Sequence, residues 1–353
     1  GRFTGGPTVE SLEKALAERV GVPHAVGVSS GTDALLCTLM AMGIGPGDEV
    51  IVPTFTFFAT AGSVARLGAV PVFVDVDPRT FNLDPEAVSA AVTSKTKAVI
   101  VVHLFGQCAD MDAIDSIARE HGLRVIEDAA QAIDARYQDR PACSLGDAAC
   151  LSFYPTKNLG GFGEGGMVFT RDDELAEAVR SLRTHGESKR YVHERIGGNF
   201  RLDAIQAAAL RVKLDYLEEF TERRRRNAAR YDALLADAPV TTPHVADGVR
   251  HVYHQYTILC DRRDELAAFL RERGVRTGVY YPVPLHRQPC FADGIGRARP
   301  CPTAESLCRR VLSLPCHPIL TEEDVAYVAE TIRAFFASAT AARAKGGSVR
   351  VEP

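Results

Sequence analysis

The chain has 353 residues, of which 46% are hydrophobic and 24% are charged, so it is long enough to bury a large core. Its net charge of −4 provides no general attraction to nucleic acid or to anionic membranes, and we expect neither as a partner. The nine cysteines form no CxxC pair, and no apolar run approaches the roughly 20 residues that span a bilayer, so we expect a cytoplasmic protein without a metal site.

Short apolar runs alternate with helical patterns over the first part of the chain. Strands are expected at 49–53, 70–76, 98–105, 123–128, 148–154 and 165–170. Helices are expected at 8–20, 32–43, 56–67, 85–92, 110–121 and 172–183. Val- and Ile-rich strands separated by helices indicate a mainly parallel sheet that is covered on both faces. We therefore predict a large α/β domain over residues 1–218, with ligands bound at the carboxyl ends of its strands.

The rest of the chain predicts a smaller α+β domain over residues 219–338. The expected elements are a long helix at 203–236, strands at 254–260 and 275–281, and helices at 264–273 and 321–336. Residues 339–353 contain too few apolar side chains to pack, and we expect a disordered tail there. The run Arg223–Arg226 suggests nucleic-acid binding, but on a helix of an acidic chain a solvated face is the better interpretation.

The stretch LSFYPTKNLGGFGEGG (151–166) contains the first catalytic candidate. Lys157 follows an apolar strand and precedes several glycines, which allow the backbone to approach a ligand closely. A surface lysine on a turn is the ordinary alternative. In a tight loop between two buried strands, however, the amine can do covalent chemistry if it is kept partly neutral. Ser152, near the end of the preceding strand, lies where a ligand is expected.

Three more stretches suggest ligand contacts, and each also has an ordinary structural explanation. VSSGTDALL (28–36) opens a helix whose free amides attract phosphate, although Ser and Thr cap most helices. PTFTFFATA (53–61) contains phenylalanines that could stack on a flat ring, although core packing is the better prediction for each alone. EDAAQAID (127–134) has Asp128 at a strand end, where it could hold a ring nitrogen protonated or cap a helix. Together with Lys157, these signals predict a pyridoxal phosphate site.

The motifs SSGTDAL, EDAAQAI and SFYPTKNLGGFGEGGM resemble those of the DegT-type sugar aminotransferases, which are fold-type I pyridoxal phosphate enzymes acting on nucleotide-linked keto-sugars. The resemblance runs from residue 2 to about residue 336. It implies that Lys157 binds the cofactor covalently, that Asp128 holds its ring nitrogen and that Gln131 contacts its phenolic oxygen. The other implied cofactor contacts are a stacking Phe57 and the phosphate ligands Thr32, Asp33 (through its backbone) and Ser152.

The same resemblance implies a homodimer whose active sites are shared between subunits. In GGNFRLDAIQAA (197–208), Asn199 corresponds to the residue that reaches the phosphate bound by the neighbouring subunit. L-Glutamate is the implied amino donor, and the presence of Lys157 excludes the dehydratase branch, which has histidine there. The implied substrate contacts are Arg201, Tyr280, Tyr281 and His286.

The sequence indicates less clearly which carbon of the sugar carries the ketone that is aminated. TGVYYPVPLHRQPCF (277–291) resembles enzymes that aminate C3, such as those acting on UDP-3-keto-N-acetylglucosaminuronate or on a dTDP-3-keto-6-deoxyhexose. Arg201 matches a contact to the uronate carboxylate, whereas Tyr280 stands where those enzymes often have histidine. C4 amination and amination of a cyclitol ketone therefore stay open. A non-catalytic regulator on the same fold is the alternative from another class, and the intact Lys157, Asp128 and Ser152 argue against it.

Two departures from the family pattern are visible. Family chains usually begin with about two dozen further helical residues before GRFTGG (1–6), so we expect a sequence that is truncated or numbered from an internal residue. Glu164 stands where aspartate is commoner, and we expect this change to be tolerated.

Overall fold

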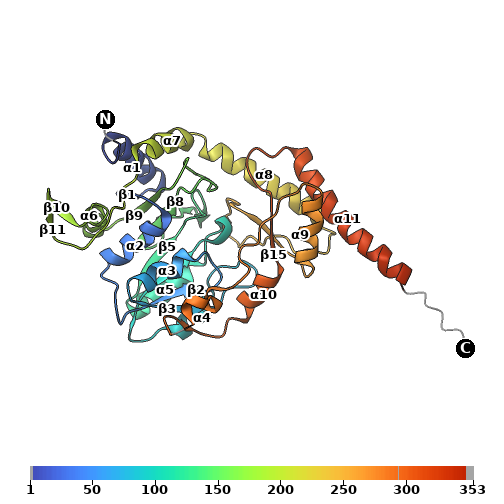
Figure 1. Ribbon diagram of the computed structural model, residues 1–353, viewed down its shortest axis with the longest axis horizontal. Helices are drawn as coiled ribbons and strands as arrows, with labels where there is room; N and C mark the ends of the chain where they lie inside the picture. The colour runs from blue at the N-terminus through green and yellow to red at the C-terminus, as the bar shows by residue number, and fades with distance from the viewer. Residues whose placement is uncertain (1–2, 293, 347–353) are drawn as a thin grey trace, which may run out of the picture.

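A sheet of eight strands forms the centre of the protein (Figure 1). The computed structural model describes residues 3–292 and 294–346. Across the sheet the strands are β1 (His24–Val28), β9 (Gly166–Thr170), β8 (Ala148–Ser152), β5 (Arg124–Asp128), β4 (Thr96–Val102), β2 (Glu49–Pro53), β3 (Val70–Val74) and β14 (Arg297–Ala298). Of these strands only β9 runs against the others, so the carboxyl ends of the rest meet at one edge.

Helices cover both faces of this sheet, which confirms the predicted mainly parallel α/β architecture. Alternate residues of a strand face opposite sides: in β4, Val99 and Val101 join one core cluster, whereas Ala98 and Ile100 join the other. The first cluster is covered by α1 (Pro7–Val20), α4 (Pro85–Ala91), α5 (Met111–His121) and α7 (Ala204–Leu214). The second cluster is covered by α2 (Gly31–Ala41), α3 (Ala59–Arg66) and α6 (Asp173–Leu182).

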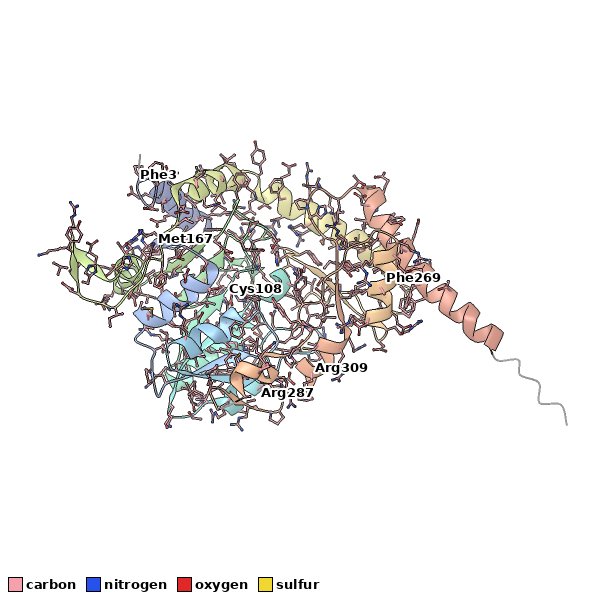
Figure 2. All side chains as sticks on the ribbon, in the orientation of Figure 1. Phe3, Cys108, Met167, Phe269, Arg287 and Arg309 are labelled. Atoms are coloured by element: carbon pink, nitrogen blue, oxygen red, sulfur yellow. The ribbon has the colours of Figure 1, made fainter. Side chains whose placement is uncertain are left out.

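A smaller α+β part lies beside the sheet, at the right of Figure 1. It has its own core, which includes Tyr231 and Tyr256. Its elements are α8 (Leu217–Leu235), α9 (Arg263–Glu272), α11 (Glu322–Gly346) and the antiparallel strands β13 (Tyr256–Leu259) and β15 (Val311–Leu314). Figure 2 shows Phe269 on α9 in this part, whereas Met167 and Cys108 lie buried in the large part.

Shorter elements occupy the connections. The hairpin of β10 (Glu187–Lys189) and β11 (Val192–His193) projects at the left of Figure 1. A small sheet and a helix complete the described residues: β6 (Arg136–Tyr137), β7 (Arg140–Pro141), β12 (Val249–Arg250) and α10 (Pro302–Arg310). Three 3-10 turns lie at Leu104–Gly106, Leu285–Arg287 and Pro289–Phe291.

Three predicted elements differ from the structure. The helix expected at 203–236 breaks after Leu214, because α7 packs on the sheet whereas α8 continues into the second core. The strand expected at 275–281 forms only a bridge between Gly278 and Ser313, and the proline at 282 has no amide to extend the pairing. Helix α11 continues to Gly346 and takes up the start of the predicted tail, while 347–353 lie outside the described residues.

The predicted boundary at residue 218 does not divide the contacts cleanly. Strand β14 extends the large sheet beside β3, although it follows that boundary in the sequence. Leu307 and Val311 also share a core cluster with Phe55 and Phe105 of the large part. The division into 1–218 and 219–338 therefore stays a prediction.

The arginine run on α8 is only partly a solvated face. Arg223 and Arg225 form ion pairs with glutamates of the same helix. Arg224 is buried and donates to backbone carbonyls, so the solvated-face prediction is wrong for this residue, which the helix turns toward the second core. Among the residues the structure describes, no helix is long and apolar enough to cross a membrane, and no cluster of metal-ligating side chains is found.

Candidate active site

The predicted site residues gather at the carboxyl edge of the sheet. Asp128 ends β5, and Ser152 ends the neighbouring strand β8. Lys157 lies in the loop that leaves β8, and α2 begins at Gly31, shortly after β1. A Cβ atom at Gly31 would lie 2.8 Å from the Ser152 Cβ. The start of α2 is therefore so close to β8 that only glycine fits there.

Asp128 is a buried carboxylate with fixed partners. Its Oδ2 accepts a hydrogen bond from Thr60 Oγ1 at 2.8 Å, and its Oδ1 accepts one from the Ala130 amide at 3.2 Å. Burial raises the pKa of Asp128, and these hydrogen bonds and the positive charge of Lys157 oppose that rise. A poorly solvated carboxylate of this kind binds strongly to a protonated ring nitrogen.

Lys157 has the partly neutral amine that covalent chemistry requires. Its backbone amide donates to the Tyr154 carbonyl at 2.8 Å, which closes a turn directly after β8. Burial lowers the pKa of Lys157 to about 8, although the negative charge of Asp128 opposes this. At pH 8 about half of these amines are neutral, compared with about 0.3% for a lysine with the ordinary pKa of 10.5.

The phosphate cradle is predicted at the N-terminus of α2. The Ser29 and Ser30 hydroxyls donate to Asp33 Oδ2 at 2.7 and 2.8 Å, and Ser30 Oγ accepts from the Asp33 amide at 3.0 Å. Thr32 is exposed and Ser152 is half-buried, so both can be reached by a phosphate. The Asp33 amide is used by the helix cap, and its predicted phosphate contact requires the Ser30 hydroxyl to release it.

The three phenylalanines of PTFTFFATA have different surroundings. Phe55 is 1% exposed and packs edge-on against Tyr281, and Phe58 packs against Phe291. Phe57 is 58% exposed, with its ring centroid 6.3 Å from that of Tyr281. Of the three, Phe57 has the most ring surface available for stacking on a flat ligand.

Gln131 connects the large part to Tyr281. Its Oε1 accepts from the Phe105 amide at 2.6 Å, and its Nε2 donates to the Tyr281 hydroxyl at 3.2 Å. These two bonds determine which way the amide points. Burial raises the pKa of Tyr281, which keeps its hydroxyl protonated. The predicted contact of Gln131 with a phenolic oxygen stays a prediction.

His286 is held by partners within the chain. Its Nδ1 lies 2.7 Å from Thr54 Oγ1, and its Nε2 lies 3.2 Å from Glu305 Oε1. Since both ring nitrogens have partners, the predicted substrate contact requires one of these bonds to open. Tyr280 is exposed, and its ring centroid lies 5.9 Å from that of Tyr281.

Asn199 and Arg201 lie on a different segment, beside the β10–β11 hairpin. The Arg201 side chain lines a hollow of about 620 Å³, and neither Lys157 nor Asp128 is among the residues that line it. Asn199 is exposed, and its side chain forms no hydrogen bond or ion pair with the described residues. The contacts within the described residues thus join neither side chain to Lys157.

The profile of the DegT/DnrJ/EryC1/StrS aminotransferase family matches residues 1–333. The chain belongs to this family. The resemblance inferred from the sequence motifs is thereby confirmed, and the protein is an aminotransferase of this family.

Individual relatives align with this chain along nearly their whole length. A pleiotropic regulatory protein of Geobacillus stearothermophilus is 54% identical over 95% of this chain and 91% of its own. A UDP-2-acetamido-2-deoxy-3-oxo-D-glucuronate aminotransferase of Pseudomonas aeruginosa is 48% identical over 91% of this chain and 88% of its own. The crystal structure of DesV of S. venezuelae, in complex with a ketimine intermediate, is 45% identical, with a TM-score of 0.92 over 95% of this chain and 91% of that one.

The residues of this aminotransferase suit pyridoxal phosphate by their chemistry. Gly31 admits Ser152 to the start of α2, where amides and hydroxyls attract a phosphate. Phe57 offers a ring face, Asp128 a buried negative charge and Lys157 a partly neutral amine. These are the four contacts that such a cofactor needs.

Several supporting residues of the aminotransferase were not predicted from its sequence. Thr60 orients Asp128. On the other side of β5, the buried Glu127 accepts from His103 Nε2 at 2.9 Å and from three backbone amides. A charged residue inside an apolar strand is a signal for such a buried pair. Asn158 and His254, whose side chains contact each other, have no comparable signal in the local sequence.

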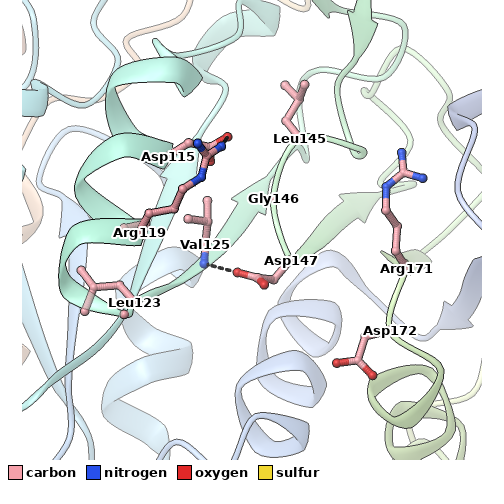
Figure 3. Close-up of a pocket in the computed structure, with 11 residues that line it drawn as sticks. Asp115, Arg119, Leu123, Val125, Leu145, Gly146, Asp147, Arg171 and Asp172 are labelled. Carbon is pink, nitrogen blue, oxygen red and sulfur yellow. Dashed lines mark hydrogen bonds and ion pairs between the residues drawn. The ribbon is translucent and has the colours of Figure 1, made fainter.

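A separate open hollow of about 510 Å³ lies at the opposite edge of the sheet (Figure 3). It is lined by Val125 near the start of β5, by Asp147 before β8 and by Arg171 after β9. Ligands of parallel sheets bind at the carboxyl ends of the strands. This hollow therefore lies away from the aminotransferase site.

Proposed function

We propose that this protein uses pyridoxal phosphate to transfer the amino group of L-glutamate to the C3 ketone of a nucleotide-linked sugar. The observation that carries the proposal is the partly neutral Lys157 beside the buried Asp128 at the carboxyl edge of the sheet. Pyridoxal phosphate, when bound, supplies an electron sink. Asp128 would hold the ring nitrogen protonated, and Lys157 would anchor the cofactor and move the proton between carbon atoms.

The name of one relative supports the C3 position, and that name and the Arg201 side chain together support the uronate. The Pseudomonas aeruginosa relative is named as an aminotransferase of a UDP-linked 3-oxo-glucuronate. Arg201 forms no hydrogen bond or ion pair within the described residues, so its guanidinium is available for bidentate binding of a carboxylate. This favours a uronate over a neutral sugar.

We expect Arg201→Met to reduce kcat/KM for a UDP-linked 3-keto-uronate by about 10²-fold and for the neutral 3-keto sugar by less than about threefold, because only the uronate loses a charge-assisted pair. The assay uses glutamate with UDP- and dTDP-linked 3-keto and 4-keto sugars. Arg195→Met, at an exposed arginine of the same segment, is the matched control and should change neither. Equal losses for both sugars would reject the uronate, and turnover of 4-keto sugars alone would reject C3.

A regulatory protein is the second candidate, because the 54% identical relative is named as a pleiotropic regulator. The presence of Lys157, Asp128 and Ser152 in one site favours catalysis, since a protein that only binds needs no partly neutral lysine. Spectroscopy of the purified protein separates the two functions. A visible cofactor band that bleaches on addition of glutamate supports the enzyme, and its absence after incubation with pyridoxal phosphate supports the regulator.

We also propose a homodimer, with Asn199 completing the partner's phosphate site. Large apolar side chains that are 74–93% exposed lie at the N-terminus, in the glycine loop, on the hairpin segment and on α7: Phe3, Phe162, Tyr191, Ile196 and Ile205. A second copy would cover them. Asn199 lies beside this apolar surface and has its amide free to donate.

Mixing two inactive variants tests the shared site. We expect Lys157→Ala and Asn199→Ala to regain about a quarter of wild-type activity after subunit exchange, because half of the dimers are mixed and each mixed dimer has one intact site. Lys157→Ala mixed with Asp128→Asn is the control, since both residues belong to the same chain's site, and it should regain nothing. If the first mixture also regains nothing although exchange is demonstrated and Asn199→Ala alone is impaired, Asn199 acts within its own chain.

A further inference from the structure

Residues 252–255, here called the strap, pack against the loop that contains Lys157. The Val252 amide donates to the Gly106 carbonyl at 2.9 Å, and Gly106 has a φ of +101°. A Cβ atom at Gly106 would lie 2.8 Å from Val252 Cγ2 and 3.0 Å from the His254 nitrogen, so the strap packs directly on this glycine. From the other side, Arg224 of α8 donates to the carbonyls of Tyr253 and His254 at 3.2 and 3.3 Å.

Asn158 joins Lys157 to the strap. This side chain is buried, although it directly follows Lys157 in the loop. Its Nδ2 donates to the Val252 carbonyl at 3.1 Å, so its Oδ1 is the acceptor that faces His254 Nδ1 at 3.3 Å. The His254 proton therefore lies on Nδ1. The strap thus holds both ends of the Asn158 amide.

Titratable or charged groups of three elements act on Lys157 or on its neighbour His254. Asp128 of β5 is negative, Arg224 of α8 is positive and His254 of the strap is neutral, because burial, Lys157 and Arg224 hold its pKa well below the ordinary value. Of the groups that affect the Lys157 pKa, only Asp128 favours the charged amine. The amine therefore stays partly neutral only while the loop keeps it away from water.

We propose that Asn158 is a positioning residue, which holds the Lys157 amine in its partly buried place by joining the loop to the strap through Val252 and His254. This inference rests on the proposed role of Lys157 as the cofactor-binding lysine. It adds that the strap, which joins the two cores through Val252 and Tyr253, controls the reactivity of a lysine that belongs to the large part. Loss of the Asn158 amide would free the loop, admit water and return Lys157 toward an ordinary lysine.

The test measures Lys157 directly in the full-length protein without cofactor. The rate at which acetic anhydride modifies Lys157 is followed by mass spectrometry against pH. The wild type should show a midpoint near pH 8. We expect Asn158→Ala to move the midpoint upward by about one pH unit, which lowers the rate at pH 7 about tenfold. Asn227→Ala is the matched control, because Asn227 is also buried and donates to a backbone carbonyl at 3.1 Å, but within the smaller part.

An Asn158→Ala midpoint that coincides with that of Asn227→Ala overturns the proposal. If Asn158→Ala does not fold, His254→Phe removes one of the two partners, and its midpoint should rise by a smaller amount. His254→Asn, which keeps a donor near the Nδ1 position, should restore the wild-type value, and an unshifted His254→Phe overturns the proposal.

Borohydride reduction of the protein loaded with cofactor separates this inference from the proposed function. If Lys157 is labelled but its midpoint does not depend on Asn158, only the positioning role fails. If another lysine is labelled, the proposed function itself fails.

Discussion

Lys157→Ala should abolish transamination, with a loss of at least about 10⁴-fold, because one amine both anchors the cofactor and transfers the proton. The fold should remain intact, since the substitution removes a poorly solvated cation rather than a core side chain. Circular dichroism and the unfolding temperature test the fold, and glutamate-dependent turnover tests the function.

The pH dependence of cofactor attachment provides an independent check on Lys157. Only the neutral amine attacks a carbonyl, and the pKa of Lys157 is lowered to about 8. The rate at which pyridoxal phosphate attaches to the cofactor-free protein should therefore rise about tenfold per pH unit below pH 8 and level off above it. Lys213→Ala is the matched control, because burial also lowers the pKa of this lysine, which donates to the Gly160 carbonyl in the glycine loop. Borohydride should still label Lys157 in that variant, and labelling of any other lysine in the wild type contradicts the assignment.

The sheet could be predicted because its signals are local. EVIVP is apolar after Glu49 and ends in proline, and β2 spans the same residues, Glu49–Pro53. Other elements depend on contacts that the sequence does not reveal. HAVGV, which contains glycine, is not among the predicted strands, yet β1 forms because it pairs along its whole length with β9. The break between α7 and α8 likewise depends on tertiary packing, because α7 packs on the core of the large sheet and α8 packs on the second core.

Some residues of the candidate site could likewise be predicted from the sequence, and others could not. Asp128 and Lys157 could be predicted because each follows its strand within a few residues, and the parallel sheet brings the strand ends together. Asn158 and His254 could not, because their contact joins residues 96 positions apart. For Asn199 and Arg201 only the family resemblance indicated a role, because their side chains have no partner within the described residues and the proposed contact of Asn199 lies in a second copy of the chain.

Asp128→Asn should reduce turnover by about 10²- to 10³-fold, because a neutral amide cannot stabilise the positive ring nitrogen that makes the cofactor an electron sink. Cofactor affinity should fall less, since the phosphate contacts and the attachment to Lys157 do not involve this carboxylate. The fold should be retained, because the substitution keeps the shape of the side chain and an oxygen that can accept from Thr60 Oγ1. Turnover is therefore measured at saturating pyridoxal phosphate, with cofactor content determined in the same sample.

A second consequence for Lys157 distinguishes this electrostatic role from a structural one. The negative charge of Asp128 raises the pKa of Lys157, so its removal should move the Lys157 midpoint below about 8, in the direction opposite to the shift expected for Asn158→Ala. Asp75→Asn is the matched control: Asp75 is also a buried carboxylate just after a parallel strand, but it accepts from the Thr303 and Ala304 amides at the start of α10. That variant should lose stability and leave the Lys157 midpoint unchanged. Near wild-type turnover in cofactor-loaded Asp128→Asn, or a Lys157 midpoint that does not fall, would remove Asp128 from the proposed role.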